Sequence, residues 1–217
     1  MLPPAASSYA PWLDQLFYII LGITTFFFVL VEGVLLYFII RYRHKPGRRA
    51  HYTHGNTKVE IIWTVIPALI LLWLAFASQN LWDRVKGSLP ANADQIEIVA
   101  EQFAWNIRYA GADKMFNTED DVTTLNQLHM PLNEPVVIWL TSKDVIHSFF
   151  VPEFRIKQDA VPGMTGRLWI TATKAGDYEL ACAELCGLGH YRMKGFVKVE
   201  PREQLEQWLL EQKEESA

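Results

Sequence analysis

The sequence predicts a membrane α-helical hairpin followed by an all-β domain, a Greek-key β-sandwich or barrel. Three observations predict this class. Two long apolar runs lie in the first half of the chain, the rest changes to short stretches of alternating polar and apolar residues, and turn residues separate those stretches. The chain of 217 residues is 50% hydrophobic, so its average composition combines two unlike parts.

The apolar runs cover residues 16–40 and 61–82. Each is long enough to cross the hydrocarbon core of a bilayer, roughly 30 Å thick, as a helix. We therefore expect two transmembrane helices within a hairpin over residues 16–82, preceded by an external N-terminal segment, residues 1–15. Pro67 lies inside the second run, where packing against neighbouring helices tolerates a kink.

Basic residues predict the orientation of the hairpin. The connecting loop, residues 41–59, carries Arg41, Arg43, Lys45, Arg48, Arg49 and Lys58. The segment before the first run has no Lys or Arg. Because basic residues collect on the inner side, the loop is predicted to be cytoplasmic, or on the matrix side of a mitochondrion, with both termini outside. No basic region precedes the first run, so a cleavable signal peptide is not indicated.

Residues 83–201 show the two-residue period of half-buried strands. The alternation is clearest in residues 95–99, 136–140, 167–173 and 195–199, with turn signals at residues 162–163 and 174–177. Many short strands separated by turns are typical of a sandwich or barrel. Beyond them, Leu205, Trp208 and Leu209 have helical spacing, so residues 202–217 are predicted to form a C-terminal amphipathic helix or tail packed on the domain or on a neighbouring subunit.

One cluster of residues carries the chemistry of the β domain. Its members are His147, Cys182, Glu184, Cys186, His190 and Met193. Thiolates, imidazoles and a thioether are ligands that suit copper in redox service. Two thiolates four residues apart can bridge two metal ions, which leaves one histidine for each ion, a methionine as a weak ligand and a main-chain carbonyl. The pattern therefore predicts a binuclear copper centre that transfers electrons.

The two cysteines also suit a disulfide in an oxidising compartment, a role as buried small hydrophobic residues, or half of a zinc site. His147 and Met193 complete a six-residue pattern that none of these three roles uses in full, so the pattern favours copper. The chain has no other cysteine and no Cys-x-x-Cys-His haem attachment motif. The net charge of −4 gives no sign of nucleic-acid binding.

The metal pattern resembles subunit II of A-type haem-copper cytochrome c oxidases and matches the family's dinuclear copper motif at every ligand position. The resemblance, which runs from the first apolar segment to about Pro201, implies a cupredoxin-like domain over residues 83–201 with a copper A centre of two copper ions. His147 and His190 would bind by imidazole, Cys182 and Cys186 would bridge, and Met193 and the Glu184 carbonyl would complete the set.

The resemblance also implies the biological role. The copper pair would accept electrons from a cytochrome c, or from a haem domain of an associated respiratory complex. It would pass them to haem in subunit I, where oxygen is reduced and protons are pumped. The implied partners are subunit I, other oxidase subunits and the lipid membrane. The implied location is the bacterial inner membrane, with the copper domain on the periplasmic side.

Two glutamates have family counterparts. Glu60 lies in a Glu-x-x-Trp-Thr-x-x-Pro stretch that ends at Pro67, which resembles the family signature at the entrance of a proton pathway into subunit I. The alternative is a carboxylate stabilised by a helix N-terminus. The Glu184 side chain would help hold magnesium or manganese at the interface with subunit I, because carboxylates suit such ions; the alternative is an ordinary loop carboxylate. Glu32, within the first run, matches no family position.

The aromatic stretch at residues 101–109 departs from the family. Phe103 stands where well-known members have the tryptophan at which electrons enter, and Trp105 keeps the second aromatic position. We expect Trp105 to be buried against the copper site, and both residues are candidates for the electron path. Lys143 replaces an acidic docking residue of several relatives, so the donor is expected to dock differently. His44, His51, His54 and His129 are predicted to be loop residues.

Three other identities share part of this pattern. A quinol oxidase subunit II has the same hairpin and fold but lacks the copper ligands. Nitrous oxide reductase carries a similar copper motif in a much longer soluble chain. A membrane-anchored copper carrier would hold one exchangeable Cu(I), but it does not account for the stretch from Glu60 to Pro67.

Overall fold

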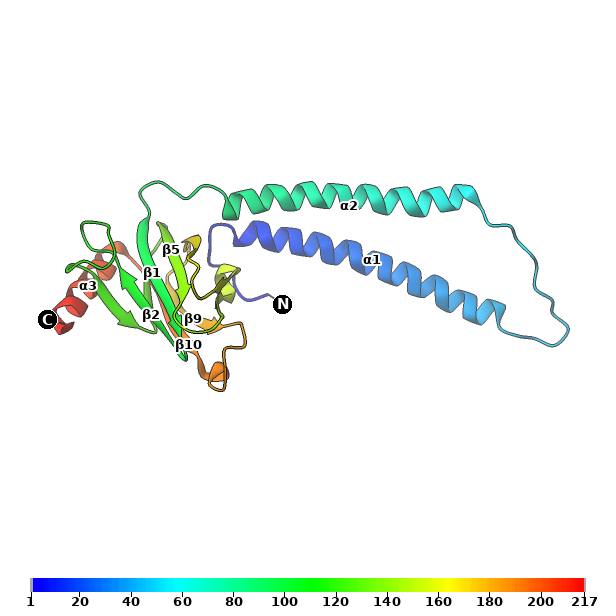
Figure 1. Ribbon diagram of the computed structural model, residues 1–217. Helices are drawn as coiled ribbons and strands as arrows, with labels where there is room; N and C mark the ends of the chain where they lie inside the picture. The colour runs from blue at the N-terminus through cyan, green and yellow to red at the C-terminus, as the bar shows by residue number, and fades with distance from the viewer. Residues whose placement is uncertain (1, 217) are drawn as a thin grey trace. The chain divides into compact units, whose positions relative to one another are not determined.

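The computed structural model describes residues 2–216, which divide into two compact units. One unit is the stretch Trp12–Trp82, and the other combines Met1–Pro11 with Asp83–Ala217. Figure 1 shows the order of the elements along the chain: two long helices, a β-sandwich and a short C-terminal helix. Residues 1–15 were predicted to be an external N-terminal segment; Met1–Pro11 groups with the sandwich, and the external location stays a prediction.

The two long helices are α1 (Ala10–Tyr42) and α2 (Thr57–Lys86), and both are long and apolar enough to cross a membrane. The side chains of their most apolar windows are not buried within the chain, as expected for surfaces that face lipid or another subunit. The side-chain oxygen of Asn56 accepts the amide hydrogens of Lys58 and Val59 at 3.1 and 3.3 Å, so Asn56 caps the start of α2. The prediction of two apolar N-terminal helices is confirmed.

In the described part of the chain the strands form two five-stranded sheets. The first has the order β3 (Val122–Leu125), β2 (Ala104–Tyr109), β1 (Asp94–Glu101), β5 (Pro135–Ser142) and β8 (Gly166–Thr171). The second has the order β4 (Gln127–Pro131), β10 (Lys194–Glu200), β9 (Gly176–Cys182), β6 (His147–Val151) and β7 (Ile156–Ala160). Two short 3-10 helices follow strands or loops, η1 (Pro152–Phe154) and η2 (His190–Arg192). The predicted β-sandwich is confirmed.

The alternating pattern of the sequence directs one face of each strand into the core. Ile96, Ile98 and Ala100 of β1 are buried, while the residues between them are partly exposed. Leu128 and Met130 of β4 are fully buried on the opposite sheet. Each of the buried isoleucine, leucine and methionine side chains contributes about 1.5–3 kcal/mol by leaving water. The result is a packed framework from which the loops at one end of the sandwich project.

The N-terminal segment extends the sandwich. The Ser8 amide donates to the carbonyl of Thr171 at 3.0 Å, and the Thr173 amide donates to the carbonyl of Ala6 at 2.8 Å. Tyr9 is 1% exposed, and burial raises the pKa of its hydroxyl well above the usual value. These contacts run along the edge of β8, so the segment covers backbone groups that an edge strand would otherwise expose.

The C-terminal helix α3 (Arg202–Ser216) packs on the sandwich. Leu205 is buried, and the Trp208 ring lies parallel to the His129 ring with 3.5 Å between their centroids. His129 was predicted to be a loop residue, and that prediction is wrong, because it lies in β4 and is 8% exposed. Its Nδ1 is 2.6 Å from Oε1 of Glu200, and burial lowers the pKa of the imidazole despite this carboxylate.

Candidate metal centre

The topology of the second sheet brings the donor residues to one edge. His147 begins β6, Cys182 ends β9 and Met193 immediately precedes β10. Strand β9 lies between β6 and β10 and runs antiparallel to both. The end of β9 therefore lies beside the starts of its two neighbours. The loop after Cys182 carries the remaining donors, and His190 begins η2 within it.

The two cysteine sulfurs are placed for bridging. Both cysteines are free, and their Sγ atoms are 3.8 Å apart. A disulfide would need about 2.05 Å. A metal–thiolate bond is about 2.3 Å, so sulfurs at this separation can both bond to the same ion. Each sulfur also faces one imidazole: the Cys182 sulfur is 3.9 Å from His147 Nδ1, and the Cys186 sulfur is 3.6 Å from His190 Nδ1.

Two weaker donors lie beside this core. The Met193 sulfur is 3.1 Å from His147 Nδ1 and 3.7 Å from the Cys186 sulfur. The main-chain oxygen of Glu184 is 3.3 Å from the Cys182 sulfur, while the Glu184 side chain is exposed. All six residues singled out from the sequence thus direct a donor atom into the same small region. Soft sulfur donors with imidazole are the set that copper prefers.

The site is buried, which affects its charge. His147 is 0% exposed and Cys186 is 2% exposed. Burial and the neighbouring Cys182 thiol raise the pKa of the Cys186 thiol to about 11. A Cys186 thiolate at neutral pH therefore needs a nearby cation, and a metal ion supplies that charge. The donor set and its burial together fit a bound metal.

Asp144 contacts the ring nitrogen of His147 that does not face the sulfurs. Nε2 of His147 is 2.9 Å from Oδ1 of Asp144, so a proton on Nε2 leaves the Nδ1 lone pair directed toward the sulfurs. The Asp144 carboxylate also accepts the amide hydrogens of Gln102 at 2.7 Å and Val145 at 2.6 Å. Burial of this carboxylate opposes its ionisation, but these hydrogen bonds outweigh it and lower the pKa of Asp144 to about 2. This contact was not predicted, because the only signal in the sequence is that Asp144 stands three residues before His147.

The turn between β1 and β2 packs against the metal loop. The Gln102 side-chain amide donates to the carbonyl of Cys186 at 2.6 Å. A Cβ atom added at Gly189 would lie 2.5 Å from the Phe103 ring, so the ring lies directly on this glycine. Gly187 has φ +128°, a conformation that residues with side chains rarely adopt. Phe103, 38% exposed, thus contacts both the loop and solvent.

Trp105 lies beneath the site. Its side chain is fully buried, and its ring centroid is 6.3 Å from that of His147 and 6.1 Å from that of Phe149. Above the site the metal loop exposes apolar side chains: Leu185, Leu188 and Tyr191 are 78%, 95% and 81% exposed. The metal region therefore packs against an aromatic side chain on its buried side, and exposed apolar side chains surround it on its outer side.

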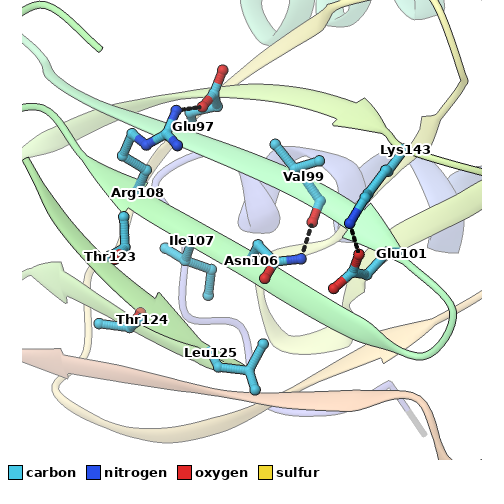
Figure 2. Close-up of a pocket in the computed structure, with 10 residues that line it drawn as sticks. All are labelled: Glu97, Val99, Glu101, Asn106, Ile107, Arg108, Thr123, Thr124, Leu125 and Lys143. Atoms are coloured by element: carbon cyan, nitrogen blue, oxygen red, sulfur yellow. Dashed lines mark hydrogen bonds and ion pairs between the residues drawn. The ribbon is translucent and has the colours of Figure 1, made fainter. Parts of the chain in front are cut away.

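A hollow of about 590 Å³ lies on the outward face of β1, β2 and β3, away from the donor cluster (Figure 2). Lys143 pairs with Glu101 at 2.7 Å, and Arg108 pairs with Glu97 at 2.6 Å. Figure 2 shows these pairs at separate places on the sheet, with Val99 and Asn106 between them. The basic side chain of Lys143 is thus matched by a carboxylate, so this face presents balanced charge.

Glu60 lies in the other unit, in the first turn of α2. Its amide donates to the carbonyl of Asn56 at 3.0 Å, and its carbonyl accepts the Thr64 hydroxyl at 2.8 Å. A carboxylate at this position is favoured by the positive end of the helix dipole. This geometry fits a carboxylate that stabilises the start of a helix, and the proton-transfer role of Glu60 stays a prediction.

A two-sheet sandwich that gathers thiols, imidazoles and a thioether at one edge, in a chain with two apolar helices, fits a membrane-anchored domain of the cupredoxin-like type with a cluster of metal-binding side chains. The family described as cytochrome c oxidase subunit II, transmembrane domain, matches residues 1–81. The family described as cytochrome c oxidase subunit II, periplasmic domain, matches residues 96–199. The chain belongs to the cytochrome c oxidase subunit II family.

Individual relatives agree with this assignment. The alternative cytochrome c oxidase subunit 2 of Bradyrhizobium diazoefficiens is 34% identical over 97% of this chain and 83% of the relative. The crystal structure of the periplasmic domain of subunit II of cytochrome oxidase of Bradyrhizobium japonicum has a TM-score of 0.54 and 25% identity, covering 60% of this chain and 100% of that domain.

A further solved structure is the mixed disulfide intermediate between a thioredoxin-like protein and subunit II of cytochrome c oxidase. It has a TM-score of 0.50 and 26% identity, covering 59% of this chain and 97% of that chain. Together the comparisons confirm the family and fold predicted from the sequence and make this chain a subunit of an oxidoreductase complex. Its two apolar helices and periplasmic-type domain fit an integral membrane protein.

Proposed function

We propose that this chain binds two copper ions in a copper A centre and is the electron-entry subunit of a terminal cytochrome c oxidase. The ligands would be His147, Cys182, the Glu184 carbonyl, Cys186, His190 and Met193. The observation that carries the proposal is the 3.8 Å separation of the two sulfurs with an imidazole nitrogen beside each. A single-copper site would leave one cysteine without a role.

When bound, the copper pair would supply one-electron transfer from an external donor to haem in subunit I, where oxygen reduction and proton pumping would occur. The residues of this chain supply a fixed environment. Strands β6, β9 and β10 hold three of the donors on one sheet edge, so the donors need little rearrangement when charge changes. Asp144 fixes the orientation of His147, and burial of Cys186 and Met193 keeps water from the sulfurs.

The donor would be a cytochrome c or a haem domain of an associated respiratory complex. Phe103 occupies the usual entry position and packs on Gly189, which precedes His190. Trp105 lies against His147 on the inner side. The exposed Leu188 and Tyr191 provide apolar surface close to the metal ligands. We therefore assign electron entry to this face, with Phe103 and Trp105 as the aromatic contacts of the site.

The cysteines must be reduced before they can bind copper. In an oxidising compartment a free pair with sulfurs 3.8 Å apart is open to oxidation to a disulfide. The solved relative in a mixed disulfide with a thioredoxin-like protein supports a reducing partner of that class for Cys182 and Cys186. Such a reductant would act before the metal binds.

Further parts of the proposal concern the complex and its location. Subunit I would be the main partner, in the bacterial inner membrane, with the copper domain on the periplasmic side. Glu60 would admit protons to a pathway in subunit I, and the exposed Glu184 carboxylate would help hold magnesium or manganese there. Carboxylates suit both tasks, since they exchange protons and bind hard cations.

The test is electron paramagnetic resonance and visible absorption of the full chain in detergent after reduction and copper loading. The full chain is needed because Ala6 and Ser8 form part of the sandwich. We expect purple colour and a signal in which two equivalent copper nuclei share one unpaired electron. A signal from a single copper nucleus, with one exchangeable ion per chain, would contradict the proposal and favour a copper carrier.

A further inference from the structure

The loop between α1 and α2 forms a basic hollow that the redox function does not use. The hollow, of about 950 Å³, opens where α1 ends. Phe38 and Tyr42 line it from the helix, and Arg43, Lys45, Arg48 and Arg49 line it from the loop. Figure 1 shows this loop joining the ends of the two long helices. The hollow therefore lies where an apolar helix meets a charged segment.

The positive charge of this loop is not balanced by carboxylates within the loop itself. Residues 41–59 contain six Lys and Arg residues and no Asp or Glu, and the next carboxylate in the sequence is Glu60. The contacts of Arg48 are neutral: it donates to the carbonyl of Arg41 at 2.8 Å, and its guanidinium lies 5.4 Å from the centre of the Tyr42 ring. Arg41 lies 5.5 Å from the same ring. These contacts gather two guanidinium groups around one aromatic side chain without neutralising either.

The hollow matches an amphiphile better than a simple ion. Phe38 and Tyr42 are 49% and 62% exposed and continue the apolar surface of α1. They offer a wall for an acyl chain, whereas the basic side chains of the loop offer donors for a phosphate. Arginine binds phosphate with two parallel hydrogen bonds, which favours a fixed headgroup. A free phosphate would use only the basic half of this surface.

We propose that this hollow binds an anionic phospholipid, with its headgroup at Arg43, Lys45 and Arg49 and its acyl chain along Phe38 and Tyr42. The charge of the loop thus has a local role in addition to orienting the hairpin. Each basic residue near an anionic membrane surface contributes roughly a fivefold gain in binding. This inference is independent of copper binding, because it concerns only the unit Trp12–Trp82.

The test compares lipid binding to the full chain in a neutral detergent by native mass spectrometry, with phosphatidylglycerol and phosphatidylcholine as probes. The loop variant is Arg43→Gln/Lys45→Gln/Arg49→Gln. It keeps Arg48, which holds the Arg41 carbonyl, and leaves Arg41 and Lys58 to orient the hairpin. The matched control, Lys114→Gln/Arg167→Gln/Lys174→Gln, removes the same charge from exposed positions of the sandwich unit.

We expect the unaltered chain and the control variant to bind phosphatidylglycerol at least tenfold more tightly than phosphatidylcholine, and the loop variant to lose this preference. Equal binding of the two lipids by the unaltered chain would overturn the proposal. An equal loss in both variants would also overturn it, because the effect would then be that of net charge. Displacement of the lipid by millimolar glycerol phosphate would show that the hollow takes a free anion instead. Circular dichroism establishes that the loop variant keeps its helices.

Discussion

Asp144→Asn tests whether copper binding depends on the hydrogen bond between Asp144 and the proposed ligand His147. The carboxylate of Asp144 is an acceptor in each of its closest contacts, with His147 Nε2 at 2.9 Å, the Gln102 amide at 2.7 Å and the Val145 amide at 2.6 Å. Asparagine has nearly the same shape but replaces one oxygen with an NH2 group and removes the negative charge. The substitution therefore changes hydrogen bonding with little change in volume.

The magnitude follows from these contacts. If the amide oxygen of the new residue still accepts hydrogen bonds from His147 and Val145, its NH2 group faces the Gln102 N–H. Two hydrogen-bond donors then face each other, so the hydrogen bond from Gln102 is lost. Loss of a hydrogen bond to a charged group costs about 1.5–3 kcal/mol. The neutral amide oxygen is also a weaker acceptor than a carboxylate for the N–H of His147, and substitution of such a supporting group lowers metal affinity by about 10–100-fold. We therefore expect Asp144→Asn to fold, to be less stable by about 2 kcal/mol, and to bind copper about 10–100-fold more weakly.

The assay is competition for copper between the full chain and a chelator of known affinity, with urea denaturation of the metal-free chain in parallel. Asp121→Asn is the matched control, because Asp121 accepts the Asn117 amide at 2.7 Å in a loop outside the proposed metal site. Copper affinity within threefold of the unaltered chain for Asp144→Asn would refute the supporting role. So would an equal loss in Asp121→Asn, because the effect would then be one of stability alone.

Four further predictions follow from the same geometry. Met193→Leu keeps the volume of a buried side chain but removes a proposed weak copper ligand, so copper should still bind while the reduction potential shifts; an unchanged potential and spectrum would contradict the assignment. Gly189→Ala places a Cβ 2.5 Å from the Phe103 ring and should lower the free energy of unfolding in urea by about 1–3 kcal/mol. The double variant Phe103→Ala/Gly189→Ala should recover this loss, and no recovery would mean that the ring does not cause it. Leu205→Ala empties a buried position under α3 and should lower the free energy of unfolding by about 2–5 kcal/mol, whereas the exposed Leu210→Ala should change it little. Burial lowers the pKa of the His129 imidazole, so the unfolded chain binds a proton at this residue more readily than the folded chain. Stability should therefore be greatest above pH ~6.5 and decline as the pH falls below it. His129→Gln should weaken that decline in thermal melts from pH ~7.5 to ~5.5.

Local patterns were sufficient for the elements but not for their pairing. Apolar length predicts α1 and α2 because a spanning helix must be apolar along about 20 residues. Alternation predicts β1, β5, β8 and β10 because side chains point to opposite faces of a strand. His129 was misassigned because its burial depends on Glu200 and on Trp208, which are more than 70 residues away in the sequence. The N-terminal segment has no periodic signal, since Ala6 and Ser8 are held by backbone hydrogen bonds that any residue can make.

The donor cluster shows how far a sequence can locate a site that only the sheet order assembles. The spacing from Cys182 to Met193 places four side chains on one loop, so their proximity follows from the chain alone. His147 is distant in the sequence and joins them because β6 pairs with β9, with Phe149 opposite Cys182. Strand β10 pairs with the other side of β9 and brings Met193 back to the same edge. Since β9 fixes both neighbours, changes that disturb its pairing should separate the donors even when every ligand is intact, whereas equal changes in β3, on the opposite sheet, should leave them together.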